Sequence, residues 1–113
     1  MGKLIIVNVN NDKRWSTSKE NCVYIGRPSL LSNPYSSKKS NIDGIIQVSS
    51  KIESLTLYKK HFQTNLNKFK PEFDKIEFLL EKFDEVYLGC FCVPDNCHGN
   101  IIKNYLLLKK YNS

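Results

Sequence analysis

The sequence predicts one small α/β domain, residues 1–113, with three layers, a short and mostly parallel sheet and about three helices. Three observations favour this class. Apolar runs of strand length occur near both ends of the chain, two amphipathic segments lie between them, and a third follows the last run. Hydrophobic residues make up 41% and charged residues 25% of the chain, which is the balance of a folded domain.

Two short strands are expected in the first quarter of the chain. Leu4–Val9 is rich in β-branched residues, and the turn formers that follow it close the strand. Val23–Ile25 forms the second strand, which Gly26 ends. Because the polar segment between the two strands lacks helical periodicity, we expect them to pair as neighbours in a hairpin-like arrangement.

A polar, serine-rich segment follows the second strand. Ser29–Asn41 contains Pro34 and is predicted to be a structured binding loop, because long loops in small domains are often functional. The next apolar residues, Ile45–Val48, indicate either a brief strand or a contact that docks this loop.

Two amphipathic helices are predicted after the loop. Ser50 and Glu53 have the spacing of a capping box, and apolar residues then recur at intervals of three and four up to Phe69. Pro71 is typical of a first helical turn, and the same periodicity continues from there to about Lys82. The pattern therefore predicts a break between the two helices at residues 67–70.

The last strand is expected to be the centre of the sheet. Val86–Val93 is apolar on both alternating faces, as in strands buried on both sides, and a final helix follows over Ile101–Leu108. Joining Val23–Ile25 to this strand through two helices implies a right-handed crossover and parallel strands. Their carboxyl ends then share one edge, which is where Rossmann-like domains bind ligands.

The first motif at this edge contains an arginine in a lysine-rich protein. Its planar guanidinium suits phosphate or carboxylate better than a lysine does, and the alternative is that Arg27 pairs with a carboxylate of the protein such as Asp84. The ligand-binding residues predicted from this motif are Gly26, Arg27, Pro28, Ser29, Asn33 and Tyr35.

The second motif places thiols and an imidazole at the start of the last helix, in residues Cys90, Cys92, Cys97, His98, Gly99 and Asn100. A helix start can hold an anion, for which Gly99 and Asn100 are predicted ligand-binding residues. It can also acidify a thiol, which makes Cys92, Cys97 and His98 the candidate catalytic residues.

Zinc is the third interpretation of the same motif. Its ligands would be Cys90, Cys92, Cys97 and His98. The spacing is not the paired C-x2-C knuckle that closes a tetrahedral site easily, so no metal is favoured and zinc stays the alternative cofactor.

Charge and hydropathy narrow the partners. The formal net charge of +6 favours anionic small ligands, but no basic stripe is interleaved with aromatic residues, so nucleic acid is not expected as the primary partner. No apolar run approaches the length that spans a bilayer, and no export signal precedes the four cysteines. We therefore expect a cytoplasmic protein with reduced thiols and no membrane partner; a second copy of the chain or a host protein remains an alternative partner.

Taken together, the motifs resemble a family whose activity is unassigned. They are Val23-Tyr24-Ile25-Gly26-Arg27-Pro28-Ser29, Asn33-Pro34-Tyr35 and Cys90-x-Cys92-x-Pro94-x-x-Cys97-His98-Gly99. In order and separation they are similar to those of the domain-of-unknown-function family numbered forty-three twenty-six, except that Ser32 stands where the family usually has glycine. The resemblance implies a compact α/β domain from a phage or bacterium.

The leading functional hypothesis is a site for a nucleotide- or nucleoside-type anionic ligand at the carboxyl edge of the sheet. Arg27 and the helix start at residues 97–100 would hold phosphate, while Asn33 and Tyr35 would orient sugar or base. If the ligand is transformed, the Cys/His chemistry indicates a transferase or hydrolase. The alternatives are a zinc-stabilised Cys/His interaction module and a phage protein that sequesters a host nucleotide signal.

Overall fold

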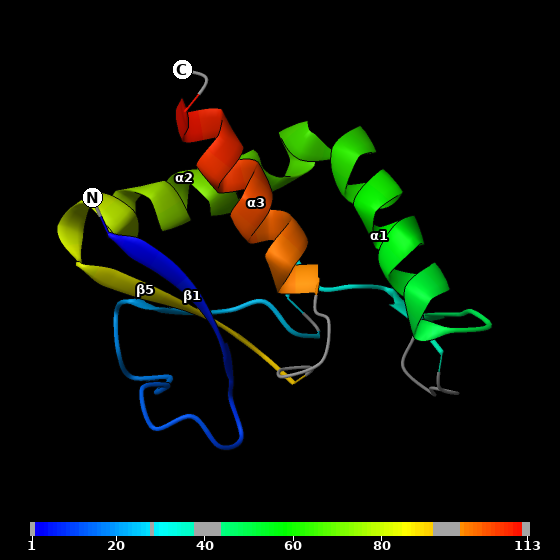
Figure 1. The fold of residues 1–113 in the computed structure, drawn as a ribbon, viewed down its shortest axis with the longest axis horizontal. Helices are drawn as coiled ribbons and strands as arrows, with labels where there is room; N and C mark the ends of the chain where they lie inside the picture. The colour runs from blue at the N-terminus through cyan, green and yellow to red at the C-terminus, as the bar shows by residue number, and fades with distance from the viewer. Residues whose placement is uncertain (1, 28, 38–43, 92–97, 112–113) are drawn as a thin grey trace.

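The computed structural model describes residues 2–27, 29–37, 44–91 and 98–111, and Figure 1 shows their arrangement. The elements in chain order are β1 (Lys3–Asn8), β2 (Cys22–Tyr24), β3 (Tyr35–Ser36), β4 (Ile46–Gln47), α1 (Lys51–Thr64), α2 (Leu66–Lys82), β5 (Glu85–Cys90) and α3 (His98–Tyr111). No helix in these ranges is long and apolar enough to cross a membrane.

The main sheet has three parallel strands in the order β1-β5-β2. The expected central strand is confirmed, because β5 pairs with β1 on one side and with β2 on the other. In this register Val7 and Tyr24 both lie beside Gly89. The parallel pairing of β2 and β5 is also confirmed, so the carboxyl ends of all three strands lie at one edge.

The expected hairpin-like pairing of the first two strands is wrong, since β5 lies between β1 and β2. The physical reason is the burial of β5: Val86, Leu88 and Cys90 have no exposed surface, and a strand this apolar is most stable with a neighbour on each side. Residues 9–21 are long enough to pass across the sheet from β1 to β2.

The helices cover one face of the sheet, with α2 and α3 packed above it and α1 beside α3 (Figure 1). Aromatic rings join the three helices: Tyr105 of α3 lies 5.4 Å from Phe62 of α1 and 5.1 Å from Phe73 of α2, measured between ring centroids. The side chains of Leu88 and Cys90 on β5 belong to the same core. This arrangement confirms an α/β fold with a short parallel sheet and three helices.

The segment between β1 and β2, which contains no helix, lies against the opposite face of the sheet (Figure 1). Trp15 packs on Gly89, where an added Cβ would lie 2.5 Å from the indole ring. The Arg14 guanidinium lies 5.5 Å from the centre of the Tyr87 ring. Glycine at position 89 is therefore what allows the indole to approach the central strand.

The start of α1 follows the predicted capping box in part. The Ser50 hydroxyl accepts a hydrogen bond from the backbone N–H of Glu53 at 3.1 Å. The Glu53 carboxylate accepts a hydrogen bond from the Ser49 hydroxyl. Ser50 is thus the N-cap, and the glutamate bonds one residue earlier than a reciprocal box would place it.

The break between the first two helices lies at Asn65, so the predicted break at residues 67–70 is wrong. The Asn65 N–H donates to Phe62 at the end of α1, and its carbonyl accepts from Lys68 in the first turn of α2. Pro71 consequently lies inside α2. Phe69 packs against Phe62 from its place on α2, and this tertiary contact outweighs the local proline signal.

Within the predicted segment Ile45–Val48, the strand is β4 (Ile46–Gln47), so the segment is more than a docking contact. Ile46 pairs in parallel with Tyr35, and the Val48 N–H donates to the Ser36 carbonyl at 2.8 Å. Val48 is buried, whereas Ile46 is exposed. β3 (Tyr35–Ser36) lies inside the segment Ser29–Asn41 that was predicted to be loop throughout, so that prediction is wrong at these two residues, where pairing with β4 and packing against α1 hold the chain extended.

Candidate functional site

The two sequence motifs meet at the carboxyl edge of the sheet. His98, the first residue of α3, donates from Nε2 to the carbonyl of Ile25, directly after β2, at 2.8 Å. The convergence expected from the topology is therefore present for the described residues. We call the following set the edge site: Gly26, Arg27, Ser29, Asn33, Tyr35, His98, Gly99 and Asn100.

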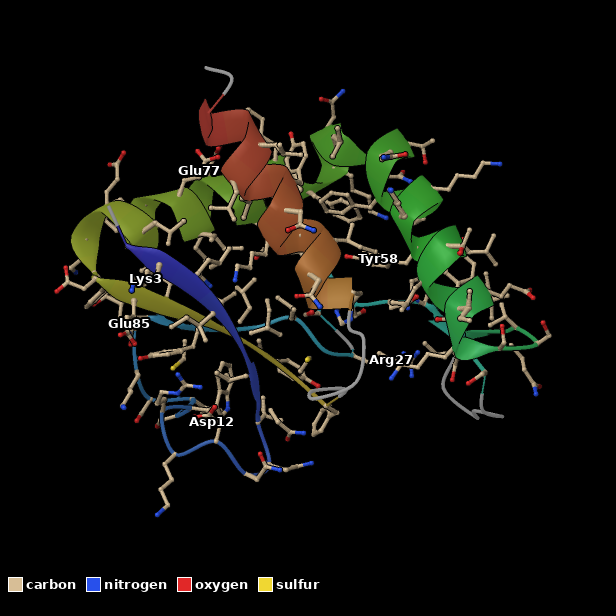
Figure 2. All side chains as sticks on the ribbon, in the orientation of Figure 1. Lys3, Asp12, Arg27, Tyr58, Glu77 and Glu85 are labelled. Atoms are coloured by element: carbon tan, nitrogen blue, oxygen red, sulfur yellow. The ribbon has the colours of Figure 1, made fainter. Side chains whose placement is uncertain are left out.

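Arg27 is half-buried and uses one side of its guanidinium to hold the loop (Figure 2). Its Nε donates to the Asn33 carbonyl at 2.8 Å, and its Nη2 donates to the Tyr35 carbonyl at 3.2 Å. The alternative pairing with Asp84 is wrong, because Asp84 precedes β5 and lies at the opposite edge of the sheet. The other N–H groups of the guanidinium make no hydrogen bond to the described residues.

Asn33 and Tyr35 are tied to helix α1 through Ser54, a residue that the sequence analysis did not single out. The Asn33 amide donates to the Ser54 hydroxyl at 2.9 Å, and that hydroxyl donates to the Tyr35 carbonyl at 2.7 Å. The sequence does contain one indication of this role: Ser54 lies four residues before Tyr58, which places it on the buried face of α1. The two loop residues thus have a structural role here.

Tyr58 also connects α1 to the edge site and was missed by sequence reasoning. Its side chain projects from α1 toward the start of α3, where its ring lies 5.2 Å from the His98 ring, edge to face (Figure 2). The Tyr58 hydroxyl donates to the Leu31 carbonyl at 2.7 Å. A fully buried tyrosine needs such a partner, so its hydroxyl fixes the Leu31 backbone against α1.

Ser29 has the unusual feature of a buried hydroxyl without a hydrogen-bond partner among the described residues. Its backbone is well held, because the N–H donates to the Gly26 carbonyl at 2.8 Å. Nearly all buried polar groups in proteins are paired, so an orphaned hydroxyl two residues after Arg27 calls for a partner such as a ligand or a water molecule.

His98 is buried, with 4% of its surface exposed. A carbonyl can only accept, so the bond to Ile25 places the proton on Nε2 in the neutral imidazole. Burial lowers the pKa of His98 below its usual 6.5, although the bond to Ile25 acts in the opposite direction. The ring is therefore a neutral donor that fastens α3 to the end of β2.

Gly99 allows the start of α3 to approach the sheet closely. A Cβ at this position would lie 2.9 Å from Ile25 Cδ1 and 3.1 Å from Ile6 Cδ1, which is closer than side chains pack. Asn100 is exposed at the same helix start. Gly99 is buried and has no side chain. At this helix start a ligand would therefore contact the Asn100 side chain or main-chain N–H groups.

Three predicted site residues lie outside the described residues: the candidate catalytic thiols Cys92 and Cys97, and the predicted ligand-binding residue Pro28. Cys90 is fully buried in the core, and Cys22 is a half-buried free thiol. Within the described ranges, no three histidine, cysteine, aspartate or glutamate side chains gather in a group that could hold a metal. The catalytic thiols and the alternative zinc ligands remain predictions.

The fold and the edge site define a small parallel α/β domain with a candidate ligand site at the carboxyl ends of its strands. The model of one family, described as Domain of unknown function (DUF4326), matches residues 7–107, so the chain belongs to this family. The resemblance seen in the motifs is thereby confirmed. No curated protein and no solved structure matches the chain.

Proposed function

We propose that this is a cytoplasmic protein of a phage or bacterium that binds a nucleotide- or nucleoside-type anionic ligand at the edge site. The observation that carries the proposal is the buried hydroxyl of Ser29, which has no hydrogen-bond partner among the described residues and follows the half-buried Arg27 by two residues. A phosphate oxygen would accept hydrogen bonds from both groups and would satisfy the orphaned hydroxyl.

The placement of Arg27 supports an anionic ligand. Its Nε and Nη2 bond backbone carbonyls, so the guanidinium is held in one orientation without its charge being neutralised by them. The outer edge of the guanidinium, with Nη1, is the part suited to phosphate. The net charge of +6 adds long-range attraction for an anion.

The start of α3 supports the same ligand class. The bond from His98 to Ile25 brings this helix start to the end of β2, two residues before Arg27. The first N–H groups of a helix have no intrahelical acceptor, and together with the helix dipole they favour an anion. Exposed Asn100 lies in this first turn and would contact the sugar or phosphate.

The state of His98 favours binding over proton transfer by this residue. Its Nε2 bonds a backbone carbonyl, its ring is buried, and burial disfavours the charged form that a proton carrier must reach. Any turnover would then depend on Cys92 or Cys97 as the nucleophile. Mutating these two cysteines therefore distinguishes a transferase or hydrolase from a protein that only binds the ligand.

A cytoplasmic location is supported by the state of Cys22. Cys22 is a free thiol, and a cysteine outside a disulfide is ordinary in a reducing compartment and rare in secreted domains of this size.

The proposal is tested by binding of adenosine monophosphate and inorganic phosphate to the purified full chain, measured by calorimetry and by the rise in melting temperature. We expect both probes to bind the parent protein, and Arg27→Ala to weaken both by at least about tenfold, since a charge-assisted hydrogen bond contributes about 1.5–3 kcal/mol.

The matched control is Lys70→Ala, which removes one positive charge from an exposed pair with Asp74 on α2, away from the edge site. This variant should bind both probes as the parent does. Equal loss in Arg27→Ala and Lys70→Ala would reduce the effect to net charge and contradict the proposed site. If the parent protein converts the nucleotide to a product and Cys92→Ser or Cys97→Ser does not, the protein is an enzyme.

A further inference from the structure

Phe91 is an exposed aromatic residue at the carboxyl end of the most buried strand. It follows Cys90, which has no exposed surface, yet 56% of Phe91 is accessible. The alternation along β5 places Phe91 with Tyr87 and Gly89 on the face opposite the helices. A large apolar ring exposed at a sheet edge that carries a candidate ligand site calls for a functional explanation.

The Phe91 ring is held by a second aromatic ring. Tyr24 lies 6.0 Å from Phe91 between ring centroids, at an interplanar angle of 83°, which is the preferred edge-to-face geometry. Tyr24 also contacts Trp15, whose ring centroid lies 6.5 Å from that of Tyr24 and whose indole packs on Gly89. Phe91 therefore contacts Tyr24, and Tyr24 in turn contacts Trp15, which packs on the central strand at Gly89.

Tyr24 also joins this aromatic group to the edge site. Its hydroxyl donates to the carbonyl of Arg27 at 2.7 Å, while its ring contacts Phe91. Burial raises the pKa of the Tyr24 hydroxyl, so it stays a neutral donor in this bond. One side chain thus spans from the proposed phosphate-binding residue to the exposed ring.

We infer that Phe91 is the stacking surface for the base of a nucleotide whose phosphate is held at Arg27, which makes the ligand a phosphorylated compound with a planar ring. This inference rests on the proposed function and adds the second half of the ligand. A nucleotide carries an anionic group and a flat aromatic group a short distance apart. The protein presents the cation of Arg27 and the exposed ring of Phe91, and Tyr24 contacts both the Arg27 main chain and the Phe91 ring.

A mononucleotide fits these observations better than a nucleic acid strand does. Single-strand binding proteins stack successive bases on several exposed aromatic rings along a basic groove. Here Tyr24 and Trp15 are only partly exposed and support Phe91, which is the one phenylalanine, tyrosine or tryptophan at this edge that is largely exposed among the described residues.

The test compares three probes, adenosine monophosphate, ribose 5-phosphate and adenosine, on the parent protein and on Phe91→Ala, Phe91→Leu and Phe91→Tyr. Phe91→Ala should weaken adenosine monophosphate and adenosine by about 5-fold to 150-fold, the range for loss of one stacked base. Ribose 5-phosphate, which lacks a base, should bind as before. Phe91→Tyr should retain affinity, and Phe91→Leu should lose it, because leucine keeps apolar volume without a ring.

The outcomes separate this inference from the proposed function. If adenosine monophosphate is weakened by Arg27→Ala but binds Phe91→Ala as it binds the parent, the stacking role is overturned and the phosphate site stands. If neither phosphorylated probe binds the parent, both fall. A thymidine oligonucleotide is the further probe. If it binds the parent far more tightly than adenosine monophosphate does, and Phe91→Ala abolishes this higher affinity, the mononucleotide inference is overturned and the ligand is a single strand. A melting temperature for each variant near that of the parent confirms that the fold is intact.

Discussion

The imidazole of His98 and the carbonyl of Ile25 are 2.8 Å apart and join the start of α3 to the end of β2. The two residues are far apart in the sequence and come from the two motifs. This bond makes the edge site a single unit, and it also makes the stability of the protein sensitive to the protonation of a buried ring.

The first prediction concerns pH. Because burial lowers the pKa of His98 in the folded state below its unfolded value of 6.5, the unfolded chain binds the proton more readily. The contribution to stability is complete above about pH 6.5 and is lost as the pH falls below it toward the folded-state pKa. Urea unfolding between about pH 5 and pH 7.5 should therefore show decreasing stability on acidification.

The control is His98→Gln, whose amide can still donate to Ile25 but does not titrate. Its unfolding free energy should vary less across the same pH interval, whatever its value at neutral pH. An identical slope in the parent and in His98→Gln would assign the pH dependence to other groups.

The second prediction concerns the hydrogen bonds by which Arg27 stabilises the loop. Removing its side chain leaves the carbonyls of Asn33 and Tyr35 without their donor, so Arg27→Ala should lower the free energy of unfolding by about 1–3 kcal/mol. Arg27→Lys should also be destabilising, since an ammonium cannot reach both carbonyls with the same geometry. Lys70→Ala, from an exposed pair, should change stability by no more than about 0.5 kcal/mol in urea titrations.

The third prediction concerns the contact between Trp15 and Gly89. A Cβ at position 89 would overlap the indole and Val9, so Gly89→Ala should destabilise the protein by about 1–3 kcal/mol. In a Trp15→Ala background the same change should cost less, by at least about 0.5 kcal/mol, because the indole overlap is gone and only that with Val9 remains. Strict additivity in this double-mutant cycle would show that another contact sets the requirement for glycine.

The fourth prediction uses the orphaned hydroxyl of Ser29. Ser29→Ala removes a buried polar group without a partner among the described residues and should raise the free energy of unfolding by about 1 kcal/mol. The same variant should bind adenosine monophosphate less tightly, by about 5-fold to 10-fold, if the hydroxyl serves the phosphate. Ser37→Ala, at an exposed position, should change neither quantity. A loss of stability in Ser29→Ala would mean that the hydroxyl is paired within the protein.

The fifth prediction concerns redox state. Cys22 is a free thiol, and we expect all four cysteines to be reduced in freshly isolated protein. Thiol titration in denaturant without reductant should detect four groups per chain. Detection of none would require two native disulfides and would contradict the cytoplasmic assignment.

Much of the fold could be predicted from local pattern because burial on both faces has a clear signature. Val86, Leu88 and Cys90 alternate with other apolar residues, and this pattern alone indicates a central strand. The same holds for the Ser50 cap of α1, whose hydroxyl satisfies a local N–H group. The convergence of the two motifs followed from parallel pairing and needed no knowledge of individual contacts.

The candidate site could be located from the sequence, but the roles of its side chains could not. Arg27 could be identified as an unusual cation, whereas its bonds to Asn33 and Tyr35 depend on how the loop folds back. The orphaned state of Ser29 and the burial of His98 likewise depend on what surrounds them. Such facts are properties of an environment and not of a residue type.

The sequence by itself determined the α/β class, the central position of β5 and the edge at which both motifs meet, because hydrophobic periodicity and parallel pairing constrain these features strongly. Only the tertiary structure decided that β5 separates β1 from β2, that Asn65 divides the helices and that Tyr24 supports an exposed Phe91. Strand order and side-chain contacts are set by the competition among distant segments for the same buried surface, and local patterns do not record which segment wins.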